Sequence, residues 1–193
     1  MNRKTSFAKF IRSVTVPPVL VISLLLILYV YKKSIFHNGY DLWLSILFLA
    51  LVPIAAYPLQ PLVKKYRDNK REGQRNLAFV LSLCGYIAAV LYGLITHVTK
   101  ELFFLFVTYF YSVIILLIFN KLLKFRSSGH ACGTIGPLVV GIYFFGWTAF
   151  IPCCILFVLT CWASLRLKRH TMQELIGGCL SCLSAFALAY VSI

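Results

Sequence analysis

The feature that most constrains this chain is a series of long apolar stretches separated by short polar segments. Several of these stretches approach or exceed the ~20 residues that an α-helix needs to cross the hydrocarbon core of a bilayer. Hydrophobic residues make up 61% of the 193 positions and charged residues only 12%, whereas roughly a quarter of a soluble domain is charged. The pattern predicts an all-α protein, a polytopic bundle of transmembrane helices.

The hydropathy pattern divides the chain into seven candidate spans, and six is the alternative count. The fifth and sixth ranges are short and contain Pro137, Pro152 and several glycines, which is typical of tilted or broken helices. No internal repeat or long linker separates two parts, so we interpret residues 1–193 as one domain. The spans lie at about 14–31, 41–63, 76–97, 101–124, 131–147, 149–165 and 174–192.

The N-terminal segment and the cysteines add two constraints. The first apolar run lacks a small-residue cleavage site and is followed by the polar segment KKSIFHNG, so we expect a retained helix rather than a signal peptide. The seven cysteines lie inside or at the ends of apolar segments, so we expect small buried hydrophobes rather than a disulfide framework. Cys179 and Cys182 have CxxC spacing, but no second pair accompanies them, so we predict no metal site.

The formal net charge of +14 is distributed unevenly. With seven spans, all of the 19 lysines and arginines except Lys32, Lys33 and Lys100 fall on one side of the membrane. The positive-inside rule would make that side cytoplasmic. Alternatively, the basic residues gather there to bind phosphate, and their number then says little about orientation. Nucleic acid is a poor partner because the charge lies in short loops between spans; anionic lipid headgroups or a phosphorylated substrate fit better.

Three polar stretches on that side carry most of the polar chemistry. The first is KKYRDNKREGQR at 64–75, the second is SSGH at 127–130, and the third is SLRLKRHTMQELIGG at 164–178. In the first stretch, the planar guanidinium groups of arginine and the point charges of lysine suit phosphate oxygens. Solvation or binding of lipid headgroups is the commoner role of such basic runs.

The third stretch contains a histidine and a carboxylate at helical spacing. If the stretch is one helix, Arg166, His170 and Glu174 fall at i, i+4 and i+8 on one face. Glu174 could then accept the Nδ1 proton of His170 and leave Nε2 as an oriented nucleophile. A snorkelling helix end with a local ion pair is the structural alternative.

The second stretch has the residues of an anion seat at a helix start. Gly129 allows close backbone approach, Ser128 offers a hydroxyl, and a helix beginning near Ala131 would direct its free N–H groups at an anion. His130 could give a proton to a leaving oxygen. A polar turn with interfacial anchors is the alternative.

In order and spacing, these stretches resemble the type 2 phosphatidic acid phosphatase superfamily of integral membrane lipid phosphatases. The family motifs are Lys, six residues, Arg-Pro; then Pro-Ser-Gly-His; then Ser-Arg, five residues, His, three residues, Asp. Lys64 and Arg71 keep the first spacing, and Ser128-Gly129-His130 match the second. His170 matches the third, with Glu174 at the position of the family's aspartate. The likeness is to a compact bacterial branch, which implies a multi-pass protein of the inner membrane.

The chain also departs from the family pattern in residues of all three motifs. Glu72 and Ser127 stand where the family has proline, and Ser164 stands where it has an arginine. Arg166, Arg169 or Arg75 could supply the missing guanidinium, and the sequence does not choose among them.

The resemblance implies a two-step reaction on a lipid phosphate or pyrophosphate. Polyprenyl pyrophosphate, phosphatidate and phosphatidylglycerol phosphate are all suitable substrates. His170 would attack phosphorus with Glu174 stabilising the imidazolium, and His130 would protonate the leaving group and then activate water. No metal or other cofactor is implied. The phosphate-binding residues would be Lys64, Arg71, Arg75, Ser128, Gly129 and Arg166.

Three other functions remain open from sequence. A lipid phosphotransferase would use the same intermediate, and a non-catalytic phospholipid-binding or scaffolding protein would retain a degenerate site. A transporter is disfavoured because Asp41, Glu101 and Glu174 lie near span ends and leave no relay at mid-membrane. Membrane lipids are the expected surroundings, and the sequence does not indicate an oligomeric state.

Overall fold

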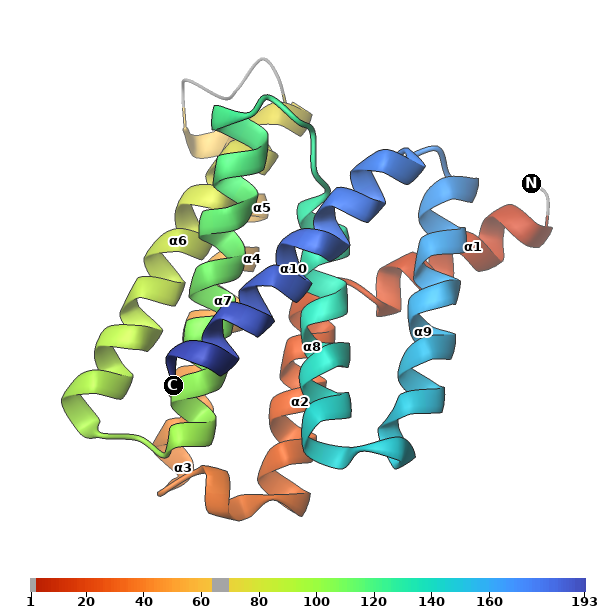
Figure 1. Ribbon diagram of the computed structural model, residues 1–193. Coiled ribbons are helices and arrows are strands. Elements are labelled where there is room, and N and C mark those ends of the chain that lie inside the picture. The colour runs from red at the N-terminus through yellow and green to blue at the C-terminus, as the bar shows by residue number, and fades with distance from the viewer. Residues whose placement is uncertain (1–2, 64–69) are drawn as a thin grey trace.

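The structure, a computed structural model, describes residues 3–63 and 70–193. These residues form helices and connecting turns without β-strands, which confirms the predicted all-α fold (Figure 1). Each predicted span coincides with a helix or a run of consecutive helices. In chain order these are α1 (Arg3–Val14), α2 (Pro17–Tyr31), η1 (Lys33–Ile35), α3 (Gly39–Ile46), η2 (Leu47–Leu51), α4 (Val52–Ile54), α5 (Ala56–Leu59), η3 (Gln60–Leu62), α6 (Lys70–Thr96), α7 (Lys100–Leu117), η5 (Ile118–Leu122), α8 (Gly129–Phe145), α9 (Trp147–Arg166) and α10 (Met172–Ser192).

Five helical segments of the described chain are long and apolar enough to cross a membrane. A sixth span results if α1 and α2, which meet at 53°, are counted as one. The helix α8, which coincides with the fifth predicted span, has 17 residues and falls just short of that length, so it is an apolar helix that is not counted among these spans. The five are Gly39–Leu62, Glu72–Thr96, Lys100–Leu122, Trp147–Arg166 and Met172–Ser192.

Local sequence signals set the ends and breaks of these helices. Pro17 opens α2, where a missing N–H costs nothing. Within Gly39–Leu62, the π-helical segment η2 and Pro53 and Pro58 divide the span into short pieces, because proline removes intrahelical hydrogen bonds. Gly146, at φ +61°, separates α8 from α9.

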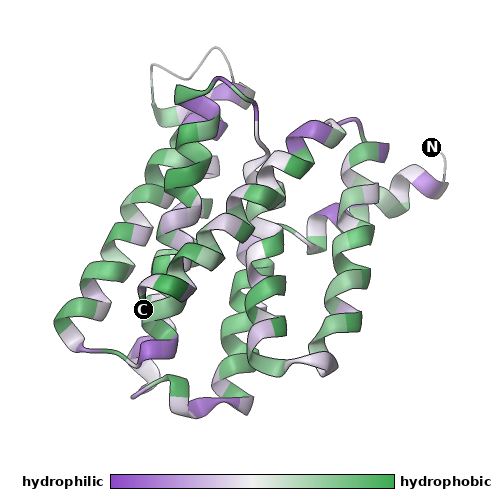
Figure 2. Cartoon of the chain, in the orientation of Figure 1, coloured by the Kyte–Doolittle hydropathy of each residue, from purple (hydrophilic) through white to green (hydrophobic). Residues whose placement is uncertain are grey.

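The bundle is built around α7. Leu102, Leu105 and Phe106 on this helix are almost fully buried, and α6 and α10 pack against it. The helix α10 crosses both α7 and α8 (Figure 1). Large apolar side chains such as Val158 and Val191 are exposed, as expected for lipid-facing surfaces. Hydrophobic residues occupy most of the length of the helices (Figure 2).

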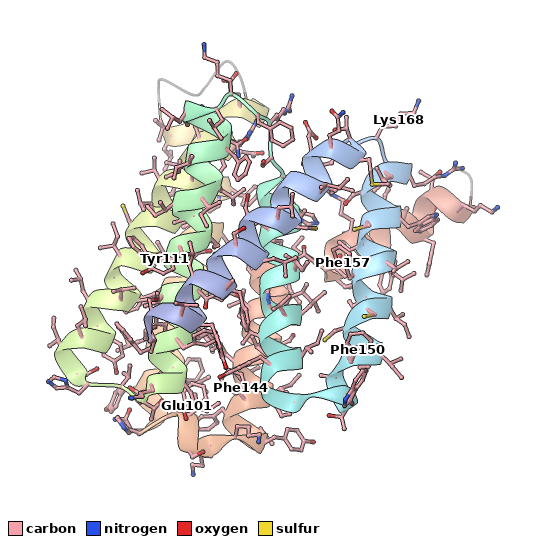
Figure 3. The ribbon with its side chains drawn as sticks, viewed as in Figure 1. Glu101, Tyr111, Phe144, Phe150, Phe157 and Lys168 are labelled. Atoms are coloured by element: carbon pink, nitrogen blue, oxygen red, sulfur yellow. The ribbon has the colours of Figure 1, made fainter. Side chains whose placement is uncertain are left out.

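The helix ends that flank the polar stretches gather at one end of the bundle. The starts of α6, α8 and α10 lie there together with the ends of η5 and α9 (Figure 1). Lys168 marks this end in Figure 3, and Glu101 marks the opposite end. The predicted spacing of the spans therefore brings the described parts of the three polar stretches together.

Candidate active site

A cavity of about 1400 Å³ opens among the helix ends at this pole and extends into the apolar bundle. Its polar mouth includes His130, His170 and Glu174, and its deeper wall includes Val113 and Leu116 of α7. Pockets for drug-sized ligands measure roughly 300–1,000 Å³, so this cavity has room for a larger and partly apolar molecule.

His170 and Glu174 form the predicted pair, but the backbone that carries them is not the single helix that was predicted. The Nδ1 atom of His170 lies 3.1 Å from Oε2 of Glu174. The interpretation of 164–178 as a single helix is wrong: α9 ends at Arg166, Lys168 has φ +49°, and α10 begins at Met172. A left-handed residue ends an α-helix, so His170 lies in the turn before α10 rather than on a continuous helix with Arg166.

Glu174 is fixed by more than His170. It completes a capping box with Thr171, whose hydroxyl oxygen accepts a hydrogen bond from the Glu174 amide at 3.2 Å while Oε2 accepts one from the Thr171 amide at 3.2 Å. Its other carboxylate oxygen lies 2.9 Å from Nε of Arg126. Since Oε1 and Oε2 are each engaged, the carboxylate is held in one orientation toward the imidazole.

Ser128, Gly129 and His130 form the first turn of α8. Ser128 is the N-cap, and its hydroxyl oxygen accepts a hydrogen bond from the Ala131 amide at 3.1 Å. Its own amide donates to the Glu174 carbonyl at 2.9 Å, which joins the second and third stretches directly. A Cβ atom added to Gly129 would meet nothing within 4 Å. Gly129 lines the cavity, so the positive end of the α8 dipole adjoins its mouth.

The two histidines lie face to face. Their ring centroids are 6.4 Å apart and their planes differ by 9°, and both residues line the cavity. His130 lies at the polar start of α8, outside the five membrane spans. Burial, followed by the nearby charges of Arg12 and His170, lowers the pKa of the His130 imidazole from 6.5 to about 3. His130 is therefore neutral near pH 7 while the cavity holds no anion.

Close approach of α10 to α8 depends on Gly178. A Cβ atom added there would collide with the Ser128 carbonyl oxygen and lie 2.9 Å from the Ala131 Cβ atom. The absence of a side chain at this position lets the turn that carries His170 and Glu174 lie against the turn that carries Ser128 and His130.

Arg75 and Asn120 connect the first polar stretch to the other two. A guanidinium N–H of Arg75 donates to Oδ1 of Asn120, and the same oxygen accepts a hydrogen bond from the Ser127 amide at 3.1 Å. Arg75 and Asn120 both line the cavity. Asn120 was not predicted, because an isolated asparagine at the end of a span carries no distinctive sequence signal.

Three predicted phosphate-binding residues remain, namely Arg166, Lys64 and Arg71. Arg166 is exposed at the end of α9 and is not among the residues that line the cavity. Lys64 and the side chain of Arg71 lie outside the described residues. Their roles stay predictions.

Arg12 is a cavity residue that sequence reasoning missed. Its Nη1 atom donates to Oγ of Ser164 at 3.3 Å, and its side chain lines the cavity with His130 and His170. Arg169 also lines the cavity, as one of the three arginines considered for the family position now occupied by Ser164. Arg12 and Ser164 lie 152 positions apart in sequence, and no local motif links them, which is why the sequence did not predict their contact.

Comparisons with protein-family models, with curated proteins and with solved structures found no match to this chain.

Proposed function

We propose that this protein is a membrane-embedded phosphatase that removes phosphate from a lipid phosphate or pyrophosphate through a phosphohistidine intermediate. The observation that carries the proposal is the oriented His170–Glu174 pair facing His130 at the basic mouth of a cavity that continues into the apolar bundle. The resemblance to the type 2 phosphatidic acid phosphatase superfamily gives the same reaction class.

In the first step, Nε2 of His170 attacks phosphorus. The hydrogen bond from Nδ1 to Glu174 selects the tautomer whose Nε2 carries the lone pair, and the carboxylate stabilises the imidazolium that develops. A P–N bond forms as the P–O bond to the leaving group breaks. The departing oxygen takes a proton from His130.

In the second step, His130 takes a proton from a water molecule, which attacks the phosphohistidine and releases inorganic phosphate. The P–N bond breaks and its electron pair returns to Nε2 of His170. Because His130 is neutral in the empty site, it needs a proton before the first step. The negative charge of a bound phosphate raises the pKa of a nearby imidazole and favours that protonation.

Charge at the mouth stabilises the phosphoryl group during transfer. The cavity mouth combines the guanidinium groups of Arg75 and Arg169 with the N-terminal turn of α8. Fixed cations and helix N-terminal amides suit the equatorial oxygens of a transferring phosphoryl group. Within the described residues, no three His, Cys, Asp or Glu side chains are grouped as metal ligands, so we expect the cations to supply this stabilisation.

The shape of the cavity favours a lipid over a water-soluble phosphate. Phe79, Val113 and Leu116 line it beyond the polar mouth. Each methylene buried from water contributes about 0.8 kcal/mol, so an acyl or prenyl chain in this part of the cavity would add substantially to binding.

Phosphate release by the purified protein in detergent tests this function. With EDTA present, we expect release from at least one of phosphatidate, phosphatidylglycerol phosphate and polyprenyl pyrophosphate. For that lipid, kcat/KM should exceed the value for glycerol 3-phosphate by at least ~100-fold, since burial of four methylenes alone contributes about 3 kcal/mol.

Two results would contradict the proposal. One is no release from any of these lipids by protein that remains folded and monodisperse. The other is release that EDTA abolishes and an added divalent metal restores. Transfer of phosphate to a lipid or sugar hydroxyl without release to water would instead identify a phosphotransferase.

A further inference from the structure

We infer that the N-terminal helix α1 supplies a phosphate-binding residue, Arg12, and that Ser164 positions it. The inference rests on the proposed function, because the anion bound is the phosphoryl group of that reaction. It assigns a role to a segment that precedes all three polar stretches and that none of them contains.

The sequence of α1 places Arg12 on the inward face of an amphipathic helix. Ala8, Arg12 and Thr15 follow at i, i+4 and i+7, so they share one side. Ala8 is fully buried and Thr15 is 1% exposed. Phe7 and Phe10 lie on other sides of the helix and are at least half exposed. Arginine on the inward face of a helix with exposed phenylalanines is directed toward the protein rather than toward water.

Packing against α9 fixes the position of α1. Ala8 and Ile11 form a small apolar cluster with Ala163, with Leu159 and Leu167 at its edge. The end of α1 packs against α8 separately from this cluster, because Thr15 is buried there and its carbonyl oxygen lies 3.5 Å from the Thr134 hydroxyl oxygen. Arg12 therefore projects from a helix anchored on both sides of its own position.

Ser164 joins two cavity arginines. It lies in the last turn of α9 and is fully buried. Its hydroxyl oxygen accepts the hydrogen bond from Arg12, and its carbonyl oxygen accepts one from the Arg169 amide at 3.0 Å. Ser164 therefore orients an arginine that comes from α1. An arginine at position 164, as in the family motif, would instead have projected from α9 itself.

The charge of Arg12 acts on the reacting groups. It is the largest electrostatic contributor, after burial, to the lowered pKa of His130. Arg12 also lines the cavity with His130, His170 and Arg169. A guanidinium that repels a proton from His130 attracts a phosphoryl dianion bound between the same groups.

The test compares Arg12→Ala with Lys4→Ala in phosphate release from the best lipid substrate. Lys4 is an exposed cation on the same helix and does not line the cavity, so its loss removes equal charge from α1. We expect Arg12→Ala to lower kcat/KM by about 100-fold, and Lys4→Ala to stay within about twofold, because exposed charges contribute little. Added guanidinium ion should restore part of the activity of Arg12→Ala and leave Lys4→Ala unchanged, a response that a misfolded variant would not give.

Binding of orthovanadate, measured by calorimetry, provides a readout that does not need turnover. Arg12→Ala should weaken it about 10- to 100-fold, since hydrogen bonds to charged groups are the stronger class. If the wild type releases phosphate and Arg12→Ala keeps both activity and vanadate affinity, the assignment of Arg12 is wrong and the proposed function stands. If the wild type releases no phosphate yet binds vanadate through Arg12, the proposed reaction is wrong and the anion site stands. If the wild type neither releases phosphate nor binds vanadate, both are wrong.

Discussion

Replacement of His170 by alanine should lower lipid phosphate hydrolysis by about 10⁴-fold or more, because removal of a covalent nucleophile eliminates the reaction path itself. His170 is the group that Glu174 orients, and its side chain is 19% exposed at the mouth of the cavity. The measurement is phosphate release under EDTA, combined with brief exposure to ³²P-labelled substrate and an alkaline quench. The wild type should retain label on the protein, and His170→Ala should retain none.

Two further variants separate the nucleophile from the groups around it. Glu174→Gln keeps a carbonyl oxygen for the capping box but loses the charge that stabilises the imidazolium, so activity should fall by about 10²- to 10⁴-fold with labelling still detectable. The His130→Ala variant should become labelled rapidly when the leaving group needs no proton, as in p-nitrophenyl phosphate. It should then lose the label slowly, because no base activates the attacking water.

His37→Ala is the matched control for these histidine variants. His37 is exposed, does not line the cavity, and makes its hydrogen bond to Asp41 through its backbone amide. Its activity should remain at the wild-type level. Undiminished labelling of folded His170→Ala would disprove the phosphohistidine at this position.

The helical architecture could be predicted from the sequence because the membrane leaves few alternatives. A run of about 20 apolar residues must satisfy its backbone hydrogen bonds internally, so hydropathy alone locates the spans. Helices that alternate in direction also place every second loop at the same end. For this reason we expected all three polar stretches at one end of the bundle. In the described residues, Arg126 forms an ion pair with Glu174, and the Ser128 amide donates a hydrogen bond to the Glu174 carbonyl oxygen.

Contacts between distant helices could not be obtained in this way. Arg12 belongs to a segment that hydropathy assigns partly to the polar N-terminus, and its packing on α9 depends on the 53° bend before α2. The small residues that permit it, such as Ala8 and Ala163, look unremarkable in sequence. The His170–Glu174 spacing gave the correct pair from an incorrect helix, because a capping box can place residues i and i+4 as close as a helical turn does.

The second large effect concerns Gly178, which has no side chain and acts on the site only by allowing α10 to approach α8. Gly178→Ala should destabilise the protein by about 1–3 kcal/mol, the usual cost of forcing extra volume into a close contact. The added methyl group would meet the Ser128 carbonyl oxygen and the Ala131 Cβ atom, which belong to the backbone and to a buried residue, and neither can rotate away.

Relief of that overlap requires α10 to move away from the first turn of α8. Such a movement would lengthen the hydrogen bond from the Ser128 amide to the Glu174 carbonyl and separate His170 from His130. A misplacement of about 1 Å can cost 10²-fold in rate, so we expect activity to fall by about that factor in the protein that remains folded. Thermal unfolding in detergent and phosphate release measure the two effects separately.

Two other glycine variants make this result specific. Gly141→Ala, on α8 and outside the cavity, would place its methyl group 3.7 Å from Leu24 and 3.8 Å from Cys153. These are ordinary contacts, so it should be neutral or stabilising by up to ~1 kcal/mol through helix propensity. Gly129→Ala adds a methyl group to open space beside the cavity mouth. It should keep its thermal stability and lose substrate affinity, because the methyl group occupies space that the phosphoryl group would fill. Wild-type activity and stability in Gly178→Ala would show that the site does not depend on the close approach of α10 to α8.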